Sequence, residues 1–389
     1  MDFGFSPEEE RFAKEVRELF LQNEELVKKA RQEYRSGGCF GPGVFGLMRK
    51  LGERGWLCPH WPKEYGGLGL SAMHHHIVMN EMDYFTGYGQ QVGTVMAGPV
   101  IMRYGTERQK KKYLPPIARG EVEFALGYTE PQAGSDTSAI DLRAVEEDDH
   151  FILNGQKMFN THPHIAKYHW LVARTAVVSP RHQGLSYFVV DLSLPGITIR
   201  PLWILGGSKG TSYRVNEVFY DDVKVPKECM IGEKNRGFYM LMEALAYERI
   251  SLTGHRQWLL EELVDCAKEL GKNDDPFIRQ ELAQLRIKLE IIKLLALKAI
   301  WMLENKIVPE IESATSKILR NDFLENLAKV QIQMHGLYGL LNKDSKWAID
   351  DGRAEWLYRS FPIDHMERGT PEIMRDIIAY RGLGLPRAR

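Results

Sequence analysis

Apolar residues recur every three or four positions along the first 120 residues, which predicts a helical N-terminal region. Its first helix is expected to begin at Ser6-Pro7-Glu8-Glu9. Serine caps helix N-termini, proline fits the first turn, and carboxylates interact well with the positive end of the helix dipole. The segments at 41–56 and 74–85 continue the helical spacing, and the Gly- and Pro-rich stretch between them predicts a loop.

Between about residues 121 and 230 the apolar positions alternate, which is typical of strands. The segments at 148–159, 185–192, 196–205 and 216–225 follow one another at short intervals, so a compact antiparallel β-domain is expected. Asn154-Gly155 lies within the first of these segments. Because Asn-Gly favours tight turns between strands, it predicts a hairpin there.

After Pro226 the helical spacing returns. The segment at 282–304 is apolar almost throughout, which implies burial among several neighbouring helices, as in a bundle. One of its faces is expected to carry Leu282, Leu285, Leu289, Ile292, Ala296, Ala299 and Leu303. The predicted domains are therefore helical over 1–122, β over 123–230 and a helical bundle over 231–389.

Composition favours a protein that acts on small molecules. The 51 basic and 52 acidic residues give a net charge of −1, so no overall field would attract nucleic acid or an anionic membrane. Four cysteines are scattered without metal-ligand spacing. The N-terminus lacks the basic start and apolar run of a signal peptide, and no segment is apolar over the length of a membrane span. We therefore expect a cytoplasmic protein with no metal.

The segment FALGYTEPQAGSDTSAI, residues 124–140, is rich in turn and hydrogen-bonding residues. Its hydroxyl groups and glycines supply neutral donors and allow close backbone approach, a combination suited to a heteroaromatic ring edge and a phosphate. A polar connector into the β-domain is the alternative. There is no GxGxxG and no βαβ pattern around it, so the segment is not a Rossmann fingerprint.

Five segments together resemble the acyl-CoA dehydrogenase family. They are TEPQAGSD (129–136), GQKMFNT (155–161), KVPKECMIGEKNRGF (224–238), QMHGLYG (333–339) and GTPEIMRDIIAYRGLGLPR (369–387). The resemblance runs from end to end and implies that family's fold: an N-terminal all-α domain, a middle antiparallel β-domain and a C-terminal four-helix bundle. It also implies an FAD enzyme of fatty or organic acid degradation that oxidises an acyl-CoA thioester to the α,β-enoyl-CoA.

In such enzymes a carboxylate removes the α-proton while flavin N5 accepts the β-hydrogen as hydride. The resemblance further implies that electrons pass to an electron-transfer flavoprotein, and that the chain forms a homotetramer built as a dimer of dimers. The positions matching the family's cofactor contacts are Leu126, Tyr128, Thr129, Gly134, Ser135, Phe159, Thr161, Gln333, Gly336, Thr370 and Glu372. Ser135 and Arg249 match contacts to the acyl-CoA.

The chain departs from the family pattern at two cofactor positions. Phe159 stands where the family usually has Trp, and His162-Pro163-His164 replaces a small turn, so the pocket near flavin N5 is expected to be unusual. Where the family commonly places an Arg for the partner's pyrophosphate, this chain has Asp274-Asp275-Pro276-Phe277. Arg279 and Arg286 are the candidate substitutes.

The catalytic base must also lie at an uncommon position. Most members carry a Glu immediately before the Gly-Thr pair, where this chain has Arg368, and a guanidinium cannot remove a proton. Members resembling isovaleryl- and long-chain enzymes place the base in a Glu-Arg pair that matches Glu248-Arg249. Glu248 is therefore our first choice, with Glu367 and Asp83 as alternatives.

Arg368 and the histidine run then need explanations of their own. Arg368 is expected to depress the pKa of Glu248, to bind a carboxylate on the acyl chain, or to pair with Glu367 or solvent. His74-His75-His76 point in different directions on a helix, which favours a polar helix face over a metal site. The alternative functions are a catalytically silent or half-site subunit of a heteromeric dehydrogenase, and a related flavin oxidase or monooxygenase.

Overall fold

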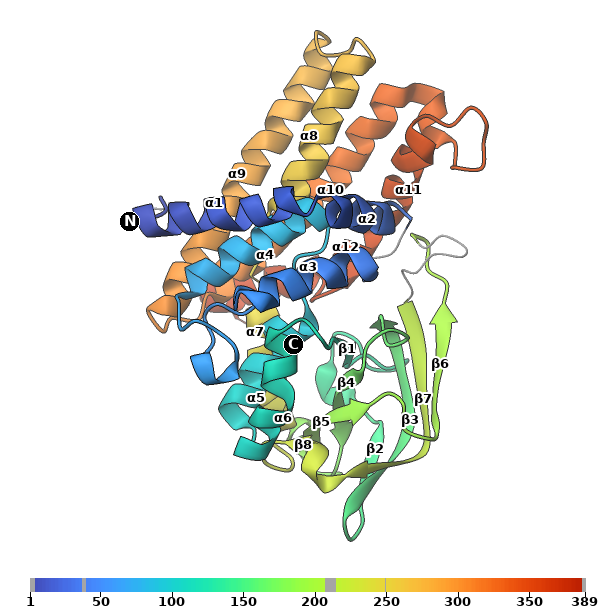
Figure 1. Ribbon diagram of the computed structural model, residues 1–389. Helices are drawn as coiled ribbons and strands as arrows, with labels where there is room; N and C mark the ends of the chain where they lie inside the picture. The colour runs from blue at the N-terminus through green and yellow to red at the C-terminus, as the bar shows by residue number, and fades with distance from the viewer. Residues whose placement is uncertain (1–3, 37–39, 207–214, 249, 387–389) are drawn as a thin grey trace.

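The N-terminal region is helical (Figure 1). The computed structural model describes residues 4–36, 40–206, 215–248 and 250–386. Ser6 caps the first helix as predicted, because its hydroxyl accepts from the backbone N–H of Glu9 while the Glu9 carboxylate accepts from the N–H of Ser6. The helices of this region are α1 (Pro7–Gln22), α2 (Glu24–Arg35), α3 (Pro42–Glu53), α4 (Ala72–Thr86), α5 (Gly98–Tyr104) and α6 (Glu107–Ala118).

The middle region is a β-domain that lies beside α5 and α6 (Figure 1). Its strands are β1 (Phe124–Gly127), β2 (Arg143–Glu146), β3 (His150–Thr161), β4 (Tyr168–Arg174), β5 (Leu185–Asp191), β6 (Ile197–Leu202), β7 (Val215–Pro226) and β8 (Met230–Ile231). In the described part of the chain they form one sheet in the order β6-β7-β3-β2-β4-β5-β8, with β1 on β4. Most ladders are antiparallel as predicted, whereas β1 and β2 pair with β4 in parallel.

The predicted hairpin at Asn154-Gly155 is wrong, because both residues lie inside β3. The chain instead turns between β2 and β3, where the N–H of Glu147 donates to the carbonyl of His150. Gly155 occupies a bulge opposite β7 with φ 141°, a conformation that favours glycine. The Asn154 side chain exchanges two hydrogen bonds with Asp222 on β7. This Asn-Gly pair therefore marks an irregularity within a long strand rather than its end.

The C-terminal region is a helical bundle. Its helices are α7 (Gly237–Glu248), α8 (Gly254–Glu269), α9 (Pro276–Glu304), α10 (Glu310–His335), α11 (Arg353–Ser360), α12 (Pro362–Met366) and α13 (Pro371–Ile377). Short helical turns lie at Lys63–Tyr65, Gly93–Ala97, Thr137–Ala139, Arg181–Gly184, Lys227–Cys229, Gly336–Leu340, Asp350–Gly352 and Ile378–Gly382. The order of a helical domain, a β-domain and a bundle confirms the predicted fold class.

The α9 helix shows two apolar faces in this single chain. One face packs into the bundle core through residues that include Leu285, Leu289 and Ile292. The other remains exposed and defines what we call the α9 apolar row: Ile287, Ile291, Leu294 and Trp301. The spacing of these residues places them on one side of the helix. Near-continuous apolarity predicted burial among several neighbours, whereas the described residues cover one of the two apolar faces.

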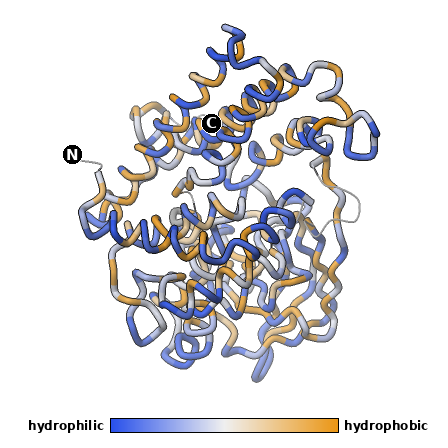
Figure 2. Tube along the Cα trace, turned by 45° about the horizontal axis from the view of Figure 1, so that its top comes forward, coloured by the Kyte–Doolittle hydropathy of each residue, from blue (hydrophilic) through white to orange (hydrophobic). Residues whose placement is uncertain are grey.

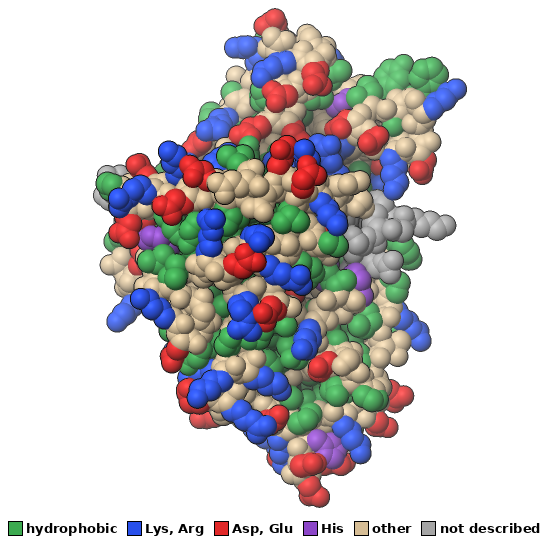
Figure 3. All heavy atoms as spheres, viewed as in Figure 1, with side chains coloured by type: hydrophobic (Ala, Val, Ile, Leu, Met, Phe, Trp, Pro, Cys, Tyr) green, Lys and Arg blue, Asp and Glu red, His purple; other side chains and the backbone are tan. Residues whose placement is uncertain are grey.

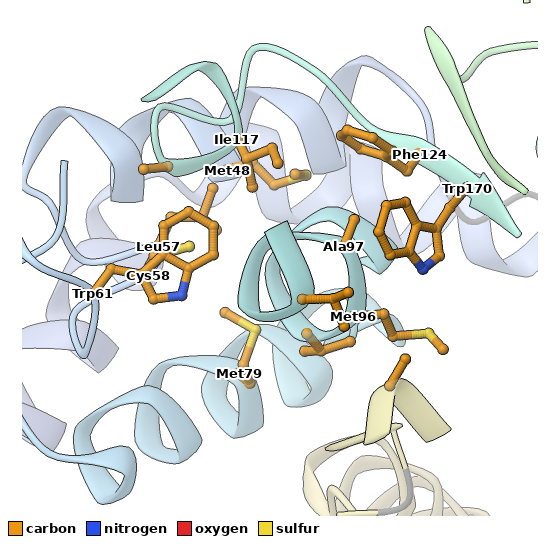
Figure 4. Close-up of a cluster of buried hydrophobic side chains, with 14 of the residues drawn as sticks. Met48, Leu57, Cys58, Trp61, Met79, Met96, Ala97, Ile117, Phe124 and Trp170 are labelled. Carbon is orange, nitrogen blue, oxygen red and sulfur yellow. The ribbon is translucent and has the colours of Figure 1, made fainter. Parts of the chain in front are cut away.

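A continuous core joins the N-terminal helices to the β-domain. Figure 4 shows Met96 and Ala97 from the helical turn at Gly93–Ala97 lying next to Phe124 of β1 and Trp170 of β4. All four side chains are buried. Figure 2 shows hydrophobic and hydrophilic positions interspersed along the chain. The N-terminal helices and the β-domain are thus held together by apolar packing.

The interpretation of the histidine run as a polar helix face is wrong, since His74 and His76 are buried. The α4 helix packs against α1, α8 and α9, which covers most of its surface. The Nδ1 atom of His74 lies 2.8 Å from the hydroxyl of Ser71, and the ring of His75 lies 4.2 Å from that of His60. In the described part of the chain, no group of three or more His, Cys, Asp or Glu side chains is placed to hold a metal ion.

Charges of both signs are interspersed over the face shown in Figure 3, in agreement with the balanced composition. Exposed ion pairs such as Lys28–Glu24 and Lys50–Glu53 contribute little to stability. Among the helices of the described residues, none combines the length and the apolarity that crossing a membrane demands.

Candidate active site

Glu248 is the last residue of α7 and its side chain is only 12% exposed. Its Oε1 atom lies 3.3 Å from the Nε atom of Arg368, which belongs to the segment between α12 and α13. Arg368 has a φ of 56° and Gly369 a φ of 92°, so the chain makes two consecutive left-handed steps at this point. The guanidinium thereby reaches back toward α7, and the two residues that the sequence singled out are brought into contact.

Arg368 stays protonated in this setting. Burial alone would lower its pKa, but the nearby charges of Glu367 and Glu248 outweigh burial and raise it. The Nε atom also lies 3.5 Å from the Oε1 atom of Glu367. Arg368 is thus engaged by two carboxylates of the chain itself, which satisfies the expected pairing and leaves less of its charge for a carboxylate on a substrate.

Gln90 links the same two residues and was not found from the sequence. Its Nε2 atom donates to the carbonyl oxygens of Glu248, at 3.3 Å, and Ile250, at 2.9 Å. Its Oε1 atom accepts a 2.6 Å hydrogen bond from Arg368. Gln90 lies in the segment between α4 and the helical turn at Gly93–Ala97, where the sequence pattern showed only a break between helices.

Two buried tyrosines border Glu248 on the side of the β-domain. The hydroxyl groups of Tyr128 and Tyr187 are hydrogen-bonded to each other. Burial raises the pKa of both phenols, and the charge of Glu248 contributes to each rise, so both tyrosines remain protonated. Tyr187 was also missed, because a tyrosine in the apolar segment at 185–192 is indistinguishable from a core residue.

His162, from the unusual turn after β3, is buried beside two aromatic residues. Its ring lies 5.1 Å from that of Phe40 and 6.1 Å from that of Tyr88. Burial lowers the pKa of His162 to about 3, so the imidazole is neutral. The charge of Arg368 and the phenol of Tyr88 interact electrostatically, which places this aromatic group next to the Glu248–Arg368 pair. The departure at 162–164 therefore adds a neutral imidazole to the aromatic residues near Arg368.

The two alternative bases have other partners. Glu367 lies 3.5 Å from Arg320 as well as from Arg368, so its carboxylate is ion-paired. Asp83 is buried and accepts a 2.8 Å hydrogen bond from the N–H of His255 in the first turn of α8. Asn80 accepts from the preceding N–H groups of Thr253 and Gly254, so Asp83 belongs to a cap of α8. Arg249 lies outside the described residues.

Behind Glu367 lies a buried cluster of charged side chains centred on Asp364. The Oδ1 atom of Asp364 lies 3.7 Å from Arg320 and 3.8 Å from Arg256, and the ammonium group of Lys317 donates to its backbone carbonyl. Burial raises the pKa of Asp364, but Arg320 and Arg256 outweigh it and lower the pKa. Burial lowers the pKa of Lys317 to about 7, helped by the charge of Arg320.

The polar segment at 129–142 is held by a buried ion pair. Glu130 and Lys157 are 2.8 Å apart, and their side chains are 2% and 0% exposed. The carboxylate of Glu130 also accepts from the N–H groups of Asp141, at 2.7 Å, and Leu142, at 2.9 Å. The acidic residue of the TEPQAGSD segment therefore closes the loop on itself, and the Lys of GQKMFNT neutralises it.

A buried arginine holds the other side of this loop. Arg174, at the end of β4, donates to the carbonyl oxygens of Ser138, at 2.8 Å, and Ile140, at 2.9 Å. It also donates to the carbonyl of Arg181 in the next loop, at 2.9 Å. Anchored at both ends, the tip of the segment at 134–136 remains exposed.

Profiles of three acyl-CoA dehydrogenase domains match the chain in order. The N-terminal domain matches residues 6–121, the middle domain residues 125–223 and the C-terminal domain residues 235–383. The chain belongs to the acyl-CoA dehydrogenase family.

Individual relatives span the whole chain. It is 30% identical to acyl-CoA dehydrogenase FadE29 of Mycobacterium tuberculosis, with 100% of this chain and 99% of that protein covered. The solved structure described as Tcur3481-Tcur3483 steroid ACAD matches with a TM-score of 0.89 at 32% identity, covering 100% of both chains. The ChsE4-ChsE5 complex from Mycobacterium tuberculosis matches with a TM-score of 0.85 at 29% identity, also covering 100% of both chains.

Like the rest of the family, this acyl-CoA dehydrogenase is an FAD-binding oxidoreductase, and some of its predicted cofactor positions are open to a bound group. A side chain at Gly134 would meet nothing within 4 Å, so the backbone there is open to a ligand, and Ser135 beside it is exposed. Phe159 is 53% exposed and has a φ of 57°, which is uncommon for a bulky residue. Its open ring is suited to packing against a flavin, and Thr161 follows at the end of the same strand.

The other predicted cofactor residues differ in what they offer. Leu126 and Thr129 are partly buried, whereas Tyr128 directs its ring into the core and its hydroxyl to Tyr187, so its side chain does not face the open loop. Thr370 caps α13, and its hydroxyl accepts from the N–H of Ile373. The pKa of the exposed Glu372 is lowered by a hydrogen bond to its own backbone N–H and by one from Thr370.

Gln333 and Gly336 are exposed where α10 ends, next to α11. The nearby departure at Asp274–Phe277 has a structural cause, because Asp275 accepts from the N–H of Phe277 and caps α9. Of the two candidate substitutes for the pyrophosphate arginine, Arg286 pairs with Glu290 and Arg279 donates to the carbonyl of Asn273.

Proposed function

We propose that this acyl-CoA dehydrogenase introduces an α,β-double bond into an acyl-CoA thioester with Glu248 as the base. The observation that carries the proposal is the Glu248–Arg368 contact of 3.3 Å at a largely buried position. The position that most members use for the base holds the guanidinium, and Glu248 lies within reach of it. An arginine beside a carboxylate favours the ionised form, which is the form that accepts a proton.

Separate residues of the chain accept the proton and keep the base charged. When bound, FAD supplies the acceptor for the hydride that leaves the β-carbon. Glu248 receives the α-proton at a carboxylate oxygen, and Arg368 keeps that carboxylate charged before the transfer. Tyr128, Tyr187 and the neutral His162 surround the pair with groups that do not compete for the proton, since none of them carries a charge.

The test is an anaerobic titration of the purified protein with butyryl-, isovaleryl-, glutaryl- and steroid-carboxylate CoA thioesters, followed by loss of flavin absorbance. Steroid thioesters are included because a close structural neighbour is described as a steroid acyl-CoA dehydrogenase. We expect Glu248→Gln to retain FAD and to reduce it at least about a thousandfold more slowly, because an amide accepts no proton. Near-normal bleaching in that variant would disprove the assignment.

We further propose that the electrons pass to an electron-transfer flavoprotein. Two relatives support this acceptor by description: subunit CarC of a caffeyl-CoA reductase-Etf complex, at 30% identity, and an electron transferring flavoprotein of Acidaminococcus fermentans, at 27% identity. An oxidase or monooxygenase is the alternative. Oxygen consumption that matches substrate turnover in the absence of any flavoprotein acceptor would favour that alternative.

A second candidate is a subunit of a two-component dehydrogenase, in place of the homotetramer. It is supported by two structural neighbours whose descriptions name two components and by the capping role of Asp275 where a pyrophosphate arginine is common. The exposed α9 apolar row supports assembly in either form. Light scattering with a flavin count decides: a homotetramer would carry one FAD per chain, whereas a half-site subunit would hold FAD only after co-purification with a second component.

A further inference from the structure

Gln90, Arg368 and Glu248 form a closed ring of contacts at the end of α7. The ring runs from the Glu248 carboxylate to Arg368, at 3.3 Å, and from Arg368 to the Gln90 amide oxygen, at 2.6 Å. It closes from the Gln90 amide nitrogen to the Glu248 backbone carbonyl, at 3.3 Å. Gln90 therefore contacts the backbone of Glu248, while its partner Arg368 contacts the Glu248 side chain.

The helix end explains why this contact matters. The last four carbonyl groups of a helix lack partners within the helix, and the terminal turn frays unless something else satisfies them. Gln90 donates to the carbonyls of Glu248 and Ile250, on either side of the point where α7 ends. A base in the last turn of a helix needs a partner for these carbonyl groups, because small rotations of the last turn displace its carboxylate.

Only an amide side chain of this length satisfies both sides of the ring. The guanidinium of Arg368 donates but cannot accept, so the Gln90 oxygen must face it, which turns the Gln90 NH₂ group toward the two carbonyls. A glutamate would accept from Arg368 but place a negative charge against carbonyl oxygens. A methionine would keep the length and lose both hydrogen bonds.

We propose that Gln90 is a positioning residue for Glu248, holding the end of α7 and the Arg368 guanidinium in one hydrogen-bonded ring. The inference rests on the proposed function, in which Glu248 is the base. It assigns a role to the segment between α4 and the helical turn at Gly93–Ala97, which no motif marks.

The charges around the ring define what its disruption does. Arg368 and Glu367 approach Glu248 from the segment before α13, and the phenols of Tyr128 and Tyr187 approach it from the β-domain. Tyr88 lies near Arg368, and Arg320 and Asp364 lie behind Glu367. Arg368 is thus the cation closest to the base among the described contacts, and a change that draws Arg368 away removes its support for the ionised form.

The test measures the pH dependence of flavin reduction in two variants, with the thioester of the panel that bleaches the wild-type flavin fastest. Gln90→Glu adds a carboxylate that competes for Arg368, so the acid limb of kcat/KM is expected to move up by about one pH unit. Gln90→Met removes both hydrogen bonds and is expected to lower kcat about tenfold with KM within threefold. Gln257→Met, which removes a glutamine hydrogen bond to Glu261 on the surface of α8, is expected to match the wild type.

Each outcome bears on the proposal. Wild-type rates and pH profiles in both Gln90 variants, alongside an inactive Glu248→Gln, would overturn the role of Gln90 and leave the base assignment standing. An active Glu248→Gln would overturn the base assignment itself. If Gln90→Met loses flavin or fails to fold, Gln90→Asn decides, because it keeps the amide but is too short to bridge Arg368 and the two carbonyls. A lowered kcat with KM unchanged would support the role of Gln90, and a wild-type kcat would overturn it.

Discussion

Removing the cation of the Glu130–Lys157 pair tests what holds the polar segment at 129–142. Lys157→Met keeps the length and apolar stem of the side chain but leaves the Glu130 carboxylate, 2% exposed, without a counterion. The N–H groups of Asp141 and Leu142 still donate to Glu130, so the charge is solvated in part. Breaking a buried pair on one side costs about 3–5 kcal/mol, a large share of a typical free energy of unfolding.

The measurement is urea unfolding of the wild type and of Lys157→Met at neutral pH, together with the flavin content of each purified protein. We expect a loss in the range above and a lower flavin content, because the loop that Glu130 closes carries Gly134 and Ser135. Lys224→Met, at an exposed position of β7, serves as the control, and its free energy of unfolding should change by no more than about 0.5 kcal/mol. The double variant Glu130→Gln/Lys157→Met should recover part of the loss, since it buries no charge. A Lys157→Met protein with wild-type stability and full flavin content would refute this reasoning.

Two further predictions concern buried carboxyl groups. Burial raises the pKa of Glu123 to about 8, although the backbone N–H of Gly93, which donates to the carboxylate, opposes this rise. The protonated Glu123 therefore stabilises the fold fully below pH 4.5, and this contribution is lost as pH rises to 8. Relative to Glu123→Gln, the wild type should therefore lose about 4 kcal/mol between pH 4.5 and 8, and parallel stability curves would contradict this. For Asp83, the capping role predicts that Asp83→Asn retains flavin reduction within a few-fold while Asp83→Ala loses about 1–2 kcal/mol of stability, and an inactive Asp83→Asn would make Asp83 the base again.

Periodic patterns predicted the fold because they report one-sided burial. The change from helical to alternating spacing near residue 121 corresponds to the start of β1 at Phe124, and the return after Pro226 to the start of α7 at Gly237. The cap at Ser6 was predictable for a similar reason, since all of its determinants lie within four residues. Collinear motifs then indicated the family, and the register of a Glu-Arg pair predicted Glu248 as the base.

Contacts between distant segments could not be predicted in this way. Asn154-Gly155 has the local chemistry of a turn, but pairing with β7 keeps it inside a strand. The burial of His74 and His76 depends on α1, α8 and α9 packing around α4. Gln90 is separated from Arg368 by 278 residues, and a single glutamine in a loop carries no signal of its partner.

If a second chain covers the α9 apolar row, as in the assembly proposed above, the stability of this protein depends on its concentration. Residues such as Ile291 and Trp301 face solvent in one chain, and covering them with another chain adds free energy only when two chains meet. The midpoint of thermal unfolding should therefore rise with protein concentration. In that proposed assembly, a chain that has not yet met its partner exposes these side chains to other unassembled chains, which favours aggregation.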